Sequence, residues 1–245
     1  MRLARIAHPE GVAFVSVDGP EGAERVREIE DHPFGNPTYT SRSWPLADTR
    51  LLAPILPSKV VAVGRNYAEH AAELGNEVPT SPIIFIKPST SVIGPNVAIQ
   101  LPASSSRVDF EGELAVVIGR PCRDVRAENA SSVILGYTVA NDVTARDQQR
   151  ADGGFTRAKG YDTFCPLGPW IETELDGEVV QDGRTSDVVF TVGEIIEFVS
   201  GIMTLLPGDV LLTGTPAGVA PMVAGQTVSV TVEGIGTLTN PVQAR

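Results

Sequence analysis

A run of alternating carboxylates, Asp109-Phe110-Glu111-Gly112-Glu113, opens an aliphatic segment of the sequence. The β-branched and aliphatic residues predict a strand, and alternate side chains of a strand point to opposite faces. We therefore expect Asp109, Glu111 and Glu113 on one face of the strand. Carboxylates two residues apart lie about 6 to 7 Å apart, close enough in a dry site to raise one another's pKa or to recruit a cation. The pattern favours a divalent metal site over its alternative, a solvent-facing edge strand.

A histidine and a glutamate three residues apart form a second candidate. The apolar segment 59–64 predicts a buried strand, and the spacing of Asn66 and Glu69 after it fits a capping box that starts a helix. His70 and Glu73 then lie on neighbouring turns, where the carboxylate can orient the imidazole and raise its basicity, as a general base requires. A surface pair is the plainer interpretation, but active-site loops commonly follow a buried strand.

Further candidates stand at the ends of other predicted strands. Lys87 ends an apolar strand and is either a lysine that reaches solvent or a cation aimed at a carboxylate substrate. Asp142 follows the strand 133–140 and either caps a short helix or adds a third carboxylate beside the acidic strand. The turn after the strand 210–213 offers backbone N–H groups and the Thr215 hydroxyl to an anion.

The elements that position these residues predict an α+β, mainly β chain with two domains. Residues 1–57 form a small β-rich module that ends in an apolar, proline-containing linker, and residues 58–245 form the larger domain. In the larger domain we expect a long helix over 191–205, opened by a capping box, and a closing hairpin over 227–242. The glycine-flanked basic loop 153–160 matches neither a P-loop nor a dinucleotide-binding motif.

Composition limits the partners. The 245-residue chain is 42% hydrophobic and carries a formal charge of -11, which disfavours nucleic acid and anionic membranes and requires local cations for acidic substrates. No apolar run approaches a membrane span, and the first nine residues lack the apolar core of a secretory signal, so we expect a cytoplasmic protein. Cys122 and Cys165 are expected to be reduced thiols.

Six short motifs, taken together and in this order, resemble the fumarylacetoacetate hydrolase (FAH) family over residues 59–245. They are Gly64-Arg65-Asn66-Tyr67-Ala68-Glu69-His70, Phe85-Ile86-Lys87-Pro88, Phe110-Glu111-Gly112-Glu113-Leu114, Asn141-Asp142-Val143-Thr144-Ala145-Arg146-Asp147, Ala158-Lys159 and Thr213-Gly214-Thr215-Pro216-Ala217-Gly218-Val219. Within the family the sequence looks most like the oxaloacetate decarboxylase and acylpyruvase branch, whose small N-terminal domain is similar to residues 1–57.

The resemblance implies a mixed β-sandwich roll, a homodimer and a bound Mg²⁺ or Mn²⁺ ion, which Ca²⁺ can replace in a crystal. It implies metal ligands Glu111, Glu113 and Asp142, catalytic residues His70, Glu73 and Lys159, and substrate contacts from Arg65, Tyr67, Lys87, Arg146, Gln149, Gly214 and Thr215. The sequence departs from the family after Leu175, where relatives usually have another stretch of roughly strand length before a turn like Asp176-Gly177-Glu178. Either a surface hairpin is shortened here or residues are missing from the sequence.

The resemblance implies cleavage of a C–C bond in a short 2-oxo acid. Three carboxylates are a hard, all-oxygen set that suits Mg²⁺, Mn²⁺ or Ca²⁺ better than zinc. A 2-oxo acid can chelate such an ion, and breaking the neighbouring C–C bond then leaves a metal-stabilised enolate. We expect either decarboxylation of oxaloacetate, or hydrolysis of an acylpyruvate by water that His70 activates, with Lys159 stabilising the oxyanion.

Two other functions stay open at this point. The first is an isomerase of the same family that moves a proton through the same enolate of 2-hydroxyhepta-2,4-diene-1,7-dioate or 5-carboxymethyl-2-hydroxymuconate. The second is a non-catalytic β module with a structural Ca²⁺ site, which needs neither the His70 and Glu73 pair nor Lys159. Loops set the pocket size and the partner of a second substrate carboxylate, so the sequence does not choose among these acids.

Overall fold

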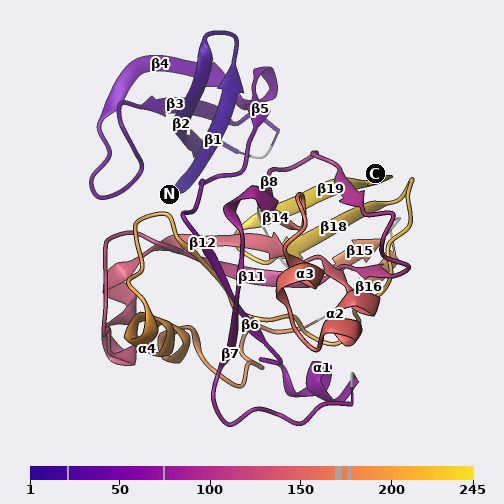
Figure 1. Ribbon diagram of the computed structural model, residues 1–245. Helices are drawn as coiled ribbons and strands as arrows, with labels where there is room; N and C mark the ends of the chain where they lie inside the picture. Colours follow the sequence, from indigo (N-terminus) through magenta and orange to yellow (C-terminus); the bar gives the residue numbers. More distant parts are fainter. Residues whose placement is uncertain (21, 74, 169–172, 176–177, 182) are drawn as a thin grey trace. The chain divides into compact units, whose positions relative to one another are not determined.

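The first unit of the chain is a small antiparallel sheet with its own core. The computed structural model describes residues 1–20, 22–73, 75–168, 173–175, 178–181 and 183–245, and divides into the compact units Met1–Leu56 and Pro57–Arg245. The first unit holds a five-stranded sheet in the order β4 (Tyr39–Pro45), β3 (Arg25–Ile29), β2 (Gly11–Asp18), β1 (Arg2–His8) and β5 (Arg50–Leu51), with a 3-10 turn η1 at Leu46–Asp48 (Figure 1). Ile6, Val15 and Val26 are fully buried in this unit, so its alternating strands enclose their own apolar cluster.

The second unit is organised around a seven-stranded mixed sheet. Its order is β7 (Ile83–Lys87), β6 (Val60–Gly64), β17 (Val210–Leu212), β11 (Gly112–Ile118), β12 (Ile134–Asn141), β14 (Cys165–Gly168) and β8 (Val92–Ile93) (Figure 1). The pairs β6 with β17 and β14 with β8 are parallel, and the other neighbours are antiparallel. Strands far apart in sequence therefore lie side by side, which brings their loops to common places.

A second, five-stranded sheet packs in the same unit. Its order is β16 (Glu178–Gln181), β15 (Thr173–Leu175), β18 (Thr227–Val232), β19 (Gly236–Ala244) and β9 (Ile99–Leu101), and β10 (Val108–Asp109) pairs with β13 (Thr144–Ala145). The predicted closing hairpin is thus formed by β18 and β19. The expected shortening after Leu175 falls on residues 176–177, which lie outside the described residues.

Helices cover part of the seven-stranded sheet. They are α1 (Ala68–Glu73), α2 (Arg146–Asp152), α3 (Thr156–Lys159) and α4 (Val192–Ile202), with 3-10 turns η2 (Ser89–Ser91) and η3 (Ala127–Val133). The predicted capping box opens α4: the Thr191 hydroxyl accepts the Glu194 N–H at 3.3 Å, and the Glu194 carboxylate accepts the Thr191 N–H at 2.8 Å. Ile196 and Val199 of α4 pack with Val116 of β11, so this helix closes one core of the unit.

One face of β11 is covered by two different partners. Leu114 packs with the cluster that joins β12 to β18 and β19, whereas Val116 packs under α4. Residues two apart share one face of a strand, so the five-stranded sheet covers one end of this face and α4 covers the other. The predicted mainly β fold class is therefore confirmed, with helices confined to particular ends of the sheet.

Two local predictions need correction. The acidic segment is not one strand, because Phe110 and Glu111 separate β10 from β11, and Asp109 pairs with Thr144 of β13. No capping box forms on Asn66. Its buried side chain instead accepts the Phe190 N–H at 2.7 Å and donates to the Thr213 carbonyl at 2.7 Å, which long-range packing favours over a local cap.

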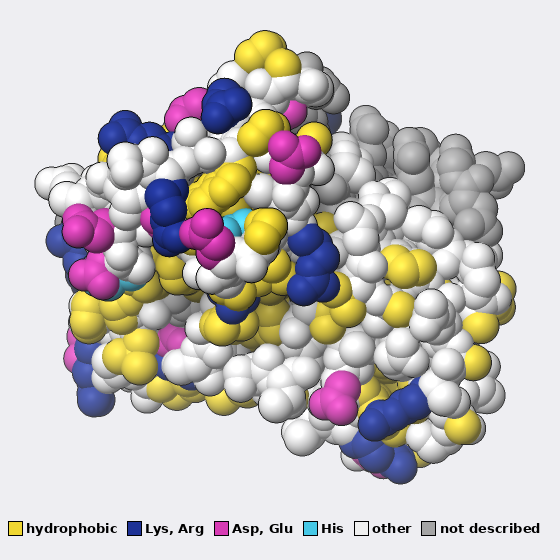
Figure 2. All heavy atoms as spheres, turned by 90° about the horizontal axis from the view of Figure 1, so that it is seen from above, with side chains coloured by type: hydrophobic (Ala, Val, Ile, Leu, Met, Phe, Trp, Pro, Cys, Tyr) yellow, Lys and Arg dark blue, Asp and Glu magenta, His cyan; other side chains and the backbone are white. Residues whose placement is uncertain are grey.

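The surface carries charges of both signs. On the face shown in Figure 2, lysine and arginine side chains are interspersed with aspartates and glutamates and with hydrophobic side chains. In the described part of the chain, no helix has both the length and the apolar character needed to cross a bilayer. Cys122 and Cys165 are both free thiols, and Cys165 is buried.

Candidate active site

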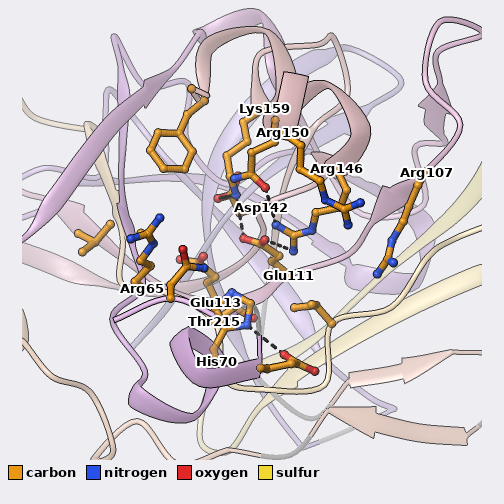
Figure 3. Close-up of a pocket in the computed structure, with 18 of the residues that line it drawn as sticks. Arg65, His70, Arg107, Glu111, Glu113, Asp142, Arg146, Arg150, Lys159 and Thr215 are labelled. Carbon is orange, nitrogen blue, oxygen red and sulfur yellow. Dashed lines mark hydrogen bonds and ion pairs between the residues drawn. The ribbon is translucent and has the colours of Figure 1, made fainter. Parts of the chain in front are cut away.

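A cavity of about 730 Å³ collects most of the predicted site residues. Segments from β6, α1, β11, α2 and α3 contribute to its wall, and Figure 3 shows their side chains pointing toward one another. Ten of the thirteen residues predicted from the sequence line it, namely Arg65, His70, Glu73, Glu111, Glu113, Asp142, Arg146, Gln149, Lys159 and Thr215.

The three predicted metal ligands meet at one point. Carboxylate oxygens of Glu111, Glu113 and Asp142 lie within 4.8 Å of one another, and all three residues are buried. The backbone fixes this meeting, because the Asp142 N–H donates to the Glu111 carbonyl at 2.8 Å and the Glu111 N–H donates to the Asn141 side-chain oxygen at 2.9 Å. The break before β11 therefore turns Glu111 toward the end of β12.

Cations surround two of these carboxylates. The Lys159 ammonium donates to Glu111 at 2.8 Å and to Asp142 at 2.6 Å, Arg146 pairs with Glu111, and the fully buried Lys87 pairs with Asp142. Burial opposes ionisation of Glu111, but Lys159 and Arg146 outweigh it and hold the pKa of this carboxyl well below its ordinary value. Burial also acts to lower the pKa of Lys159, but Asp142 and Glu111 raise it overall, so its ammonium stays charged.

Glu113 is the uncompensated member of the cluster. Its carboxylate accepts the Gly214 N–H at 2.6 Å, and no lysine or arginine among the described residues forms an ion pair with it. Burial, followed by the charges of Asp142 and Glu111, raises its pKa well above the ordinary value. A buried all-oxygen set with one carboxylate lacking a cation fits a hard divalent ion such as Mg²⁺ or Mn²⁺.

The predicted histidine pair also reaches this cavity. His70 is 5% exposed, and its Nδ1 lies 3.2 Å from Glu73 Oε2. Glu73 is held in turn by the Gly218 N–H, which donates to its two oxygens at 3.1 and 3.3 Å. When Nδ1 carries the proton donated to Glu73, Nε2 carries the lone pair that can take up a proton. Figure 3 shows His70 beside Glu113 and Thr215.

The backbone is strained where the chain leaves β6 and enters the cavity wall. Arg65 directly follows β6 and has a φ of 60°, a left-handed value that is uncommon for a side chain other than glycine. Gly214 has a φ of 99°, and an added Cβ there would lie 2.7 Å from the Asn66 Cβ, so only glycine fits. The bonds of Asn66 described above hold these two segments together.

Two arginines on the opposite side share one buried aspartate. Arg146 Nε donates to Asp109 at 2.8 Å, and Arg107 donates to the same carboxylate at 2.9 and 3.0 Å. Burial acts to lower the pKa of Arg146, but Glu111 and Asp109 raise it overall. Asp109, predicted to share the metal-binding face, therefore serves as an anchor for arginine side chains.

The structure also places residues in the wall that sequence reasoning did not select, among them Arg107, Arg150 and Phe155. A signal existed for Arg150, which follows Arg146 by four residues and so shares its helix face. Arg107 lies two residues before Asp109, directly ahead of β10. Neither position stood within a motif that carried the family resemblance.

Three predicted substrate contacts do not line the cavity. Tyr67 is buried beside a bridge to Val188, and burial raises the pKa of its hydroxyl. Lys87 contacts Asp142 from behind the cavity wall, and Gly214 contributes through its backbone N–H to Glu113. These residues support the carboxylate cluster and the segment that precedes α1.

A mainly β fold with a buried carboxylate cluster, a histidine and glutamate pair and several cations in one cavity is an arrangement typical of an enzyme active site. A family model described as the C-terminal domain of fumarylacetoacetate (FAA) hydrolase matches residues 59–243, and one described as Rv2993c-like, N-terminal, matches residues 1–54. The chain belongs to the fumarylacetoacetate hydrolase family of enzymes, so the resemblance stated from the motifs is confirmed.

Three solved structures illustrate the range of the family. The chain is similar to 5-carboxymethyl-2-hydroxymuconate delta-isomerase from Mycobacterium smegmatis, with 60% identity, a TM-score of 0.94 and 100% of both chains covered. It is similar to 2-hydroxyhepta-2,4-diene-1,7-dioate isomerase from Mycobacterium marinum, with 59% identity, a TM-score of 0.93, and 100% and 99% covered. Maleylpyruvate hydrolase from Sphingobium sp. SYK-6 matches with 28% identity, a TM-score of 0.80 and 100% of both chains covered.

These names bear on the two reactions expected from the sequence. Two of the neighbours are named as isomerases, which agrees with the alternative function rather than with the C–C bond cleavage expected first. The third is named as a hydrolase. The narrower expectation of an oxaloacetate decarboxylase or acylpyruvase finds no support in them.

Proposed function

We propose that the protein isomerises a short 2-hydroxy-2,4-dienoate, of the kind named for its isomerase neighbours, into the 2-oxo-3-enoate. The 2-hydroxyl loses a proton and C5 gains one, while the double bonds move from C2=C3 and C4=C5 to C2=O and C3=C4. The observation that carries the proposal is His70, oriented by Glu73, in the same cavity as the carboxylate cluster. A proton shift needs one group that both accepts and returns a proton, and an imidazole is suited to this.

Glu111, Glu113 and Asp142 would hold the divalent cation, for which we propose Mg²⁺ or Mn²⁺. When bound, such an ion supplies a Lewis acid that stabilises negative charge on the oxygen at C2 of the substrate. The chain's own cations complement this. Arg65 lines the cavity on one side, and Lys159 reaches into it while bridging two carboxylates.

His70 would move the proton. Its Nε2 accepts a proton while Nδ1 remains hydrogen-bonded to Glu73, and the resulting imidazolium is stabilised by that carboxylate. The buried position of His70 limits proton exchange with bulk water. The same proton can then be delivered to the carbon end of the conjugated system.

Hydrolytic C–C cleavage is the second candidate function. The same His70 and Glu73 pair can activate water, and the similarity to a maleylpyruvate hydrolase supports this chemistry in the family. In that reaction water attacks a carbonyl carbon, the adjacent C–C bond breaks, and the proton taken by His70 returns to the carbon that leaves. The oxaloacetate decarboxylation expected from the sequence also breaks a C–C bond, but it needs no attacking water and is therefore not hydrolytic.

One assay separates the candidates. Purified protein is incubated with 2-hydroxyhepta-2,4-diene-1,7-dioate and with a panel of 2-oxo acids, with Mg²⁺, Mn²⁺ or EDTA, while dienoate absorbance and pyruvate release are followed. We expect a metal-dependent loss of dienoate absorbance without pyruvate release, and EDTA should abolish it. Pyruvate release from a 2-oxo acid without any dienoate turnover would replace the first candidate by the second.

The variant His70→Ala tests the proton carrier. We expect its turnover to fall by about 10²- to 10⁴-fold, while the rise in melting temperature on adding Mg²⁺ or Mn²⁺ is retained. The matched control is His32→Ala, because His32 lies in the N-terminal unit and does not line the cavity. Full activity of His70→Ala would contradict the assignment.

A further inference from the structure

A pair of arginines in the cavity wall is not used by the chemistry above. We propose that Arg150, assisted by Arg107, forms a subsite that binds the second carboxylate of a dicarboxylate substrate. The proposal deepens the proposed function and rests on it for the identity of the reacting end. It concerns the opposite end of the same molecule.

Arg150 lies on α2 one turn after Arg146, so both side chains share a helix face toward the cavity. The two side chains differ in their burial and in their hydrogen bonds. Arg146 is buried and hydrogen-bonded to Asp109, Glu111 and Gln149, whereas Arg150 is exposed and has no hydrogen bond or ion pair within the described part of the chain. A guanidinium without an ion-pair partner in a cavity wall can bind a carboxylate through two parallel N–H donors.

Arg107 adds a fixed positive charge on the same side. Its Nε and Nη2 donate to the fully buried Asp109, which leaves Nη1 for another acceptor. The side chain is 42% exposed and lines the cavity. Figure 3 shows Arg107 and Arg150 on one side of Glu111 and Arg65 on the other.

The arrangement separates two anion-binding ends. On one side, Arg65 and Thr215 stand near the carboxylate cluster and the histidine, where the reacting 2-oxo or 2-hydroxy acid would sit. On the other side lie Arg107 and Arg150, with Glu73 of the histidine pair near enough to act on the charge of Arg107. A substrate with one carboxylate would leave these two cations unused, whereas a dioate would fill both ends.

Long-range electrostatics favour such a subsite. The chain carries a formal charge of -11, so a dianion approaching it meets a repulsive field. Only local cations can offset this repulsion at the cavity. Arg157 shows the alternative arrangement for an arginine near α2, because it is paired with Asp152 and does not line the cavity.

The test measures binding and does not depend on turnover. Calorimetry with Mg²⁺ present compares 2-oxoadipate, which has a carboxylate at each end, with 2-oxohexanoate, which has the same chain length and only one. We expect the wild type to bind 2-oxoadipate about 10- to 100-fold more tightly, as charged hydrogen bonds of this kind contribute. Arg150→Gln should remove most of that preference and change 2-oxohexanoate binding less than about two-fold.

Two further variants sharpen the result. Arg150→Lys keeps the charge but loses the two-donor geometry, so it should restore only part of the preference. Arg157→Gln is the matched control, since it removes the same charge close to α2 without touching the cavity, and it should bind both probes as the wild type does. Arg107→Gln, if folded, should lower 2-oxoadipate binding to a smaller extent than Arg150→Gln.

The outcomes distinguish this proposal from the proposed reaction. Equal binding of the two probes by the wild type overturns the subsite, as does an Arg150→Gln variant that weakens both probes equally or an Arg157→Gln variant that loses the same preference. If the wild type prefers 2-oxoadipate, Arg150→Gln loses this preference and no dienoate is turned over, the subsite is upheld and the proposed isomerisation is rejected. If dienoate is turned over but 2-oxoadipate is not preferred, the isomerisation is upheld and the subsite is rejected.

Discussion

Asp109 is the residue through which two arginines of the cavity are held. It is fully buried, and its carboxylate accepts hydrogen bonds from both Arg107 and Arg146. Arg146 in turn contacts Glu111 and Gln149. A single carboxylate thus links the cluster of Glu111, Glu113 and Asp142 to the arginine side of the cavity, and its role is to position these side chains.

The variant Asp109→Asn tests this role. An amide cannot balance two guanidinium charges, so we expect the free energy of unfolding to fall by about 3 kcal/mol, as when one partner of a buried ion pair is removed. Urea denaturation of wild type and variant measures the change.

The control is Asp124→Asn, which removes one partner of an exposed ion pair with Arg123 and should cost less than about 1 kcal/mol. An equally small effect of Asp109→Asn would show that the buried aspartate does not hold the arginines.

At the scale of elements, α2 brings three cavity residues together within one short helix, namely Arg146, Gln149 and Arg150. The segment before β10 is tied to this helix through Asp147. Its carboxylate accepts the Ser105 hydroxyl at 2.6 Å and the Ser106 N–H at 3.0 Å. These hydrogen bonds lower the pKa of Asp147 to about 2, from an ordinary value of 3.8.

This shift predicts a pH-dependent contribution to stability. Because the folded-state pKa lies below the unfolded one, the stabilisation is fully present above pH 3.8 and is lost as the pH falls toward about 2. Allowing for solvent screening, Asp147→Asn should lower the free energy of unfolding by about 1 kcal/mol at neutral pH. The difference from wild type in urea denaturation should shrink between pH 4 and pH 2.

Asp48→Asn provides the comparison, because Asp48 is exposed and its carboxylate forms no hydrogen bond within the described part of the chain. Its effect on the free energy of unfolding at neutral pH should be small. A pH-independent difference for Asp147→Asn would contradict the assigned hydrogen bonds.

At the scale of the whole molecule, an acidic chain gathers five of its nineteen basic residues around one cavity. Arg65, Arg107, Arg146, Arg150 and Lys159 all line one cavity, although acidic residues outnumber basic ones by 30 to 19. On the face shown in Figure 2, charges of both signs are interspersed. Four acidic residues, Glu73, Glu111, Glu113 and Asp142, line the same cavity, so its lining lacks the acidic excess of the whole chain.

The homodimer implied by the family resemblance stays a prediction. In residues 57–245, large hydrophobic side chains are exposed at Ile86, Tyr137, Ile202 and Leu206. A dimer interface would bury apolar side chains of this kind. Sedimentation equilibrium should give twice the chain mass of 25.9 kDa, and a single-chain mass at micromolar concentration would contradict the dimer.

The sequence by itself determined the features that local pattern encodes. The runs 59–64, 83–88 and 210–213 predicted β6, β7 and β17, and a capping box at Thr191 predicted the start of α4. Strand alternation is a local property, because it follows from the backbone geometry of each segment. The carboxylates and the histidine pair were found for the same reason: their residue types and spacing fall within single motifs.

Only the tertiary structure decided which of these groups meet. Asn66 forms hydrogen bonds with Phe190 and Thr213, which follow it in the sequence by 124 and 147 positions. Arg146 is hydrogen-bonded to Asp109, which precedes it by 37 positions. No local pattern records such contacts, so a capping box was predicted on Asn66, Asp109 was grouped with the metal-binding carboxylates, and Arg107 and Arg150 were overlooked. The cavity exists because antiparallel pairing of β11 with β12 brings Glu111 and Glu113 to Asp142, and sheet pairing depends on the packing of the whole chain.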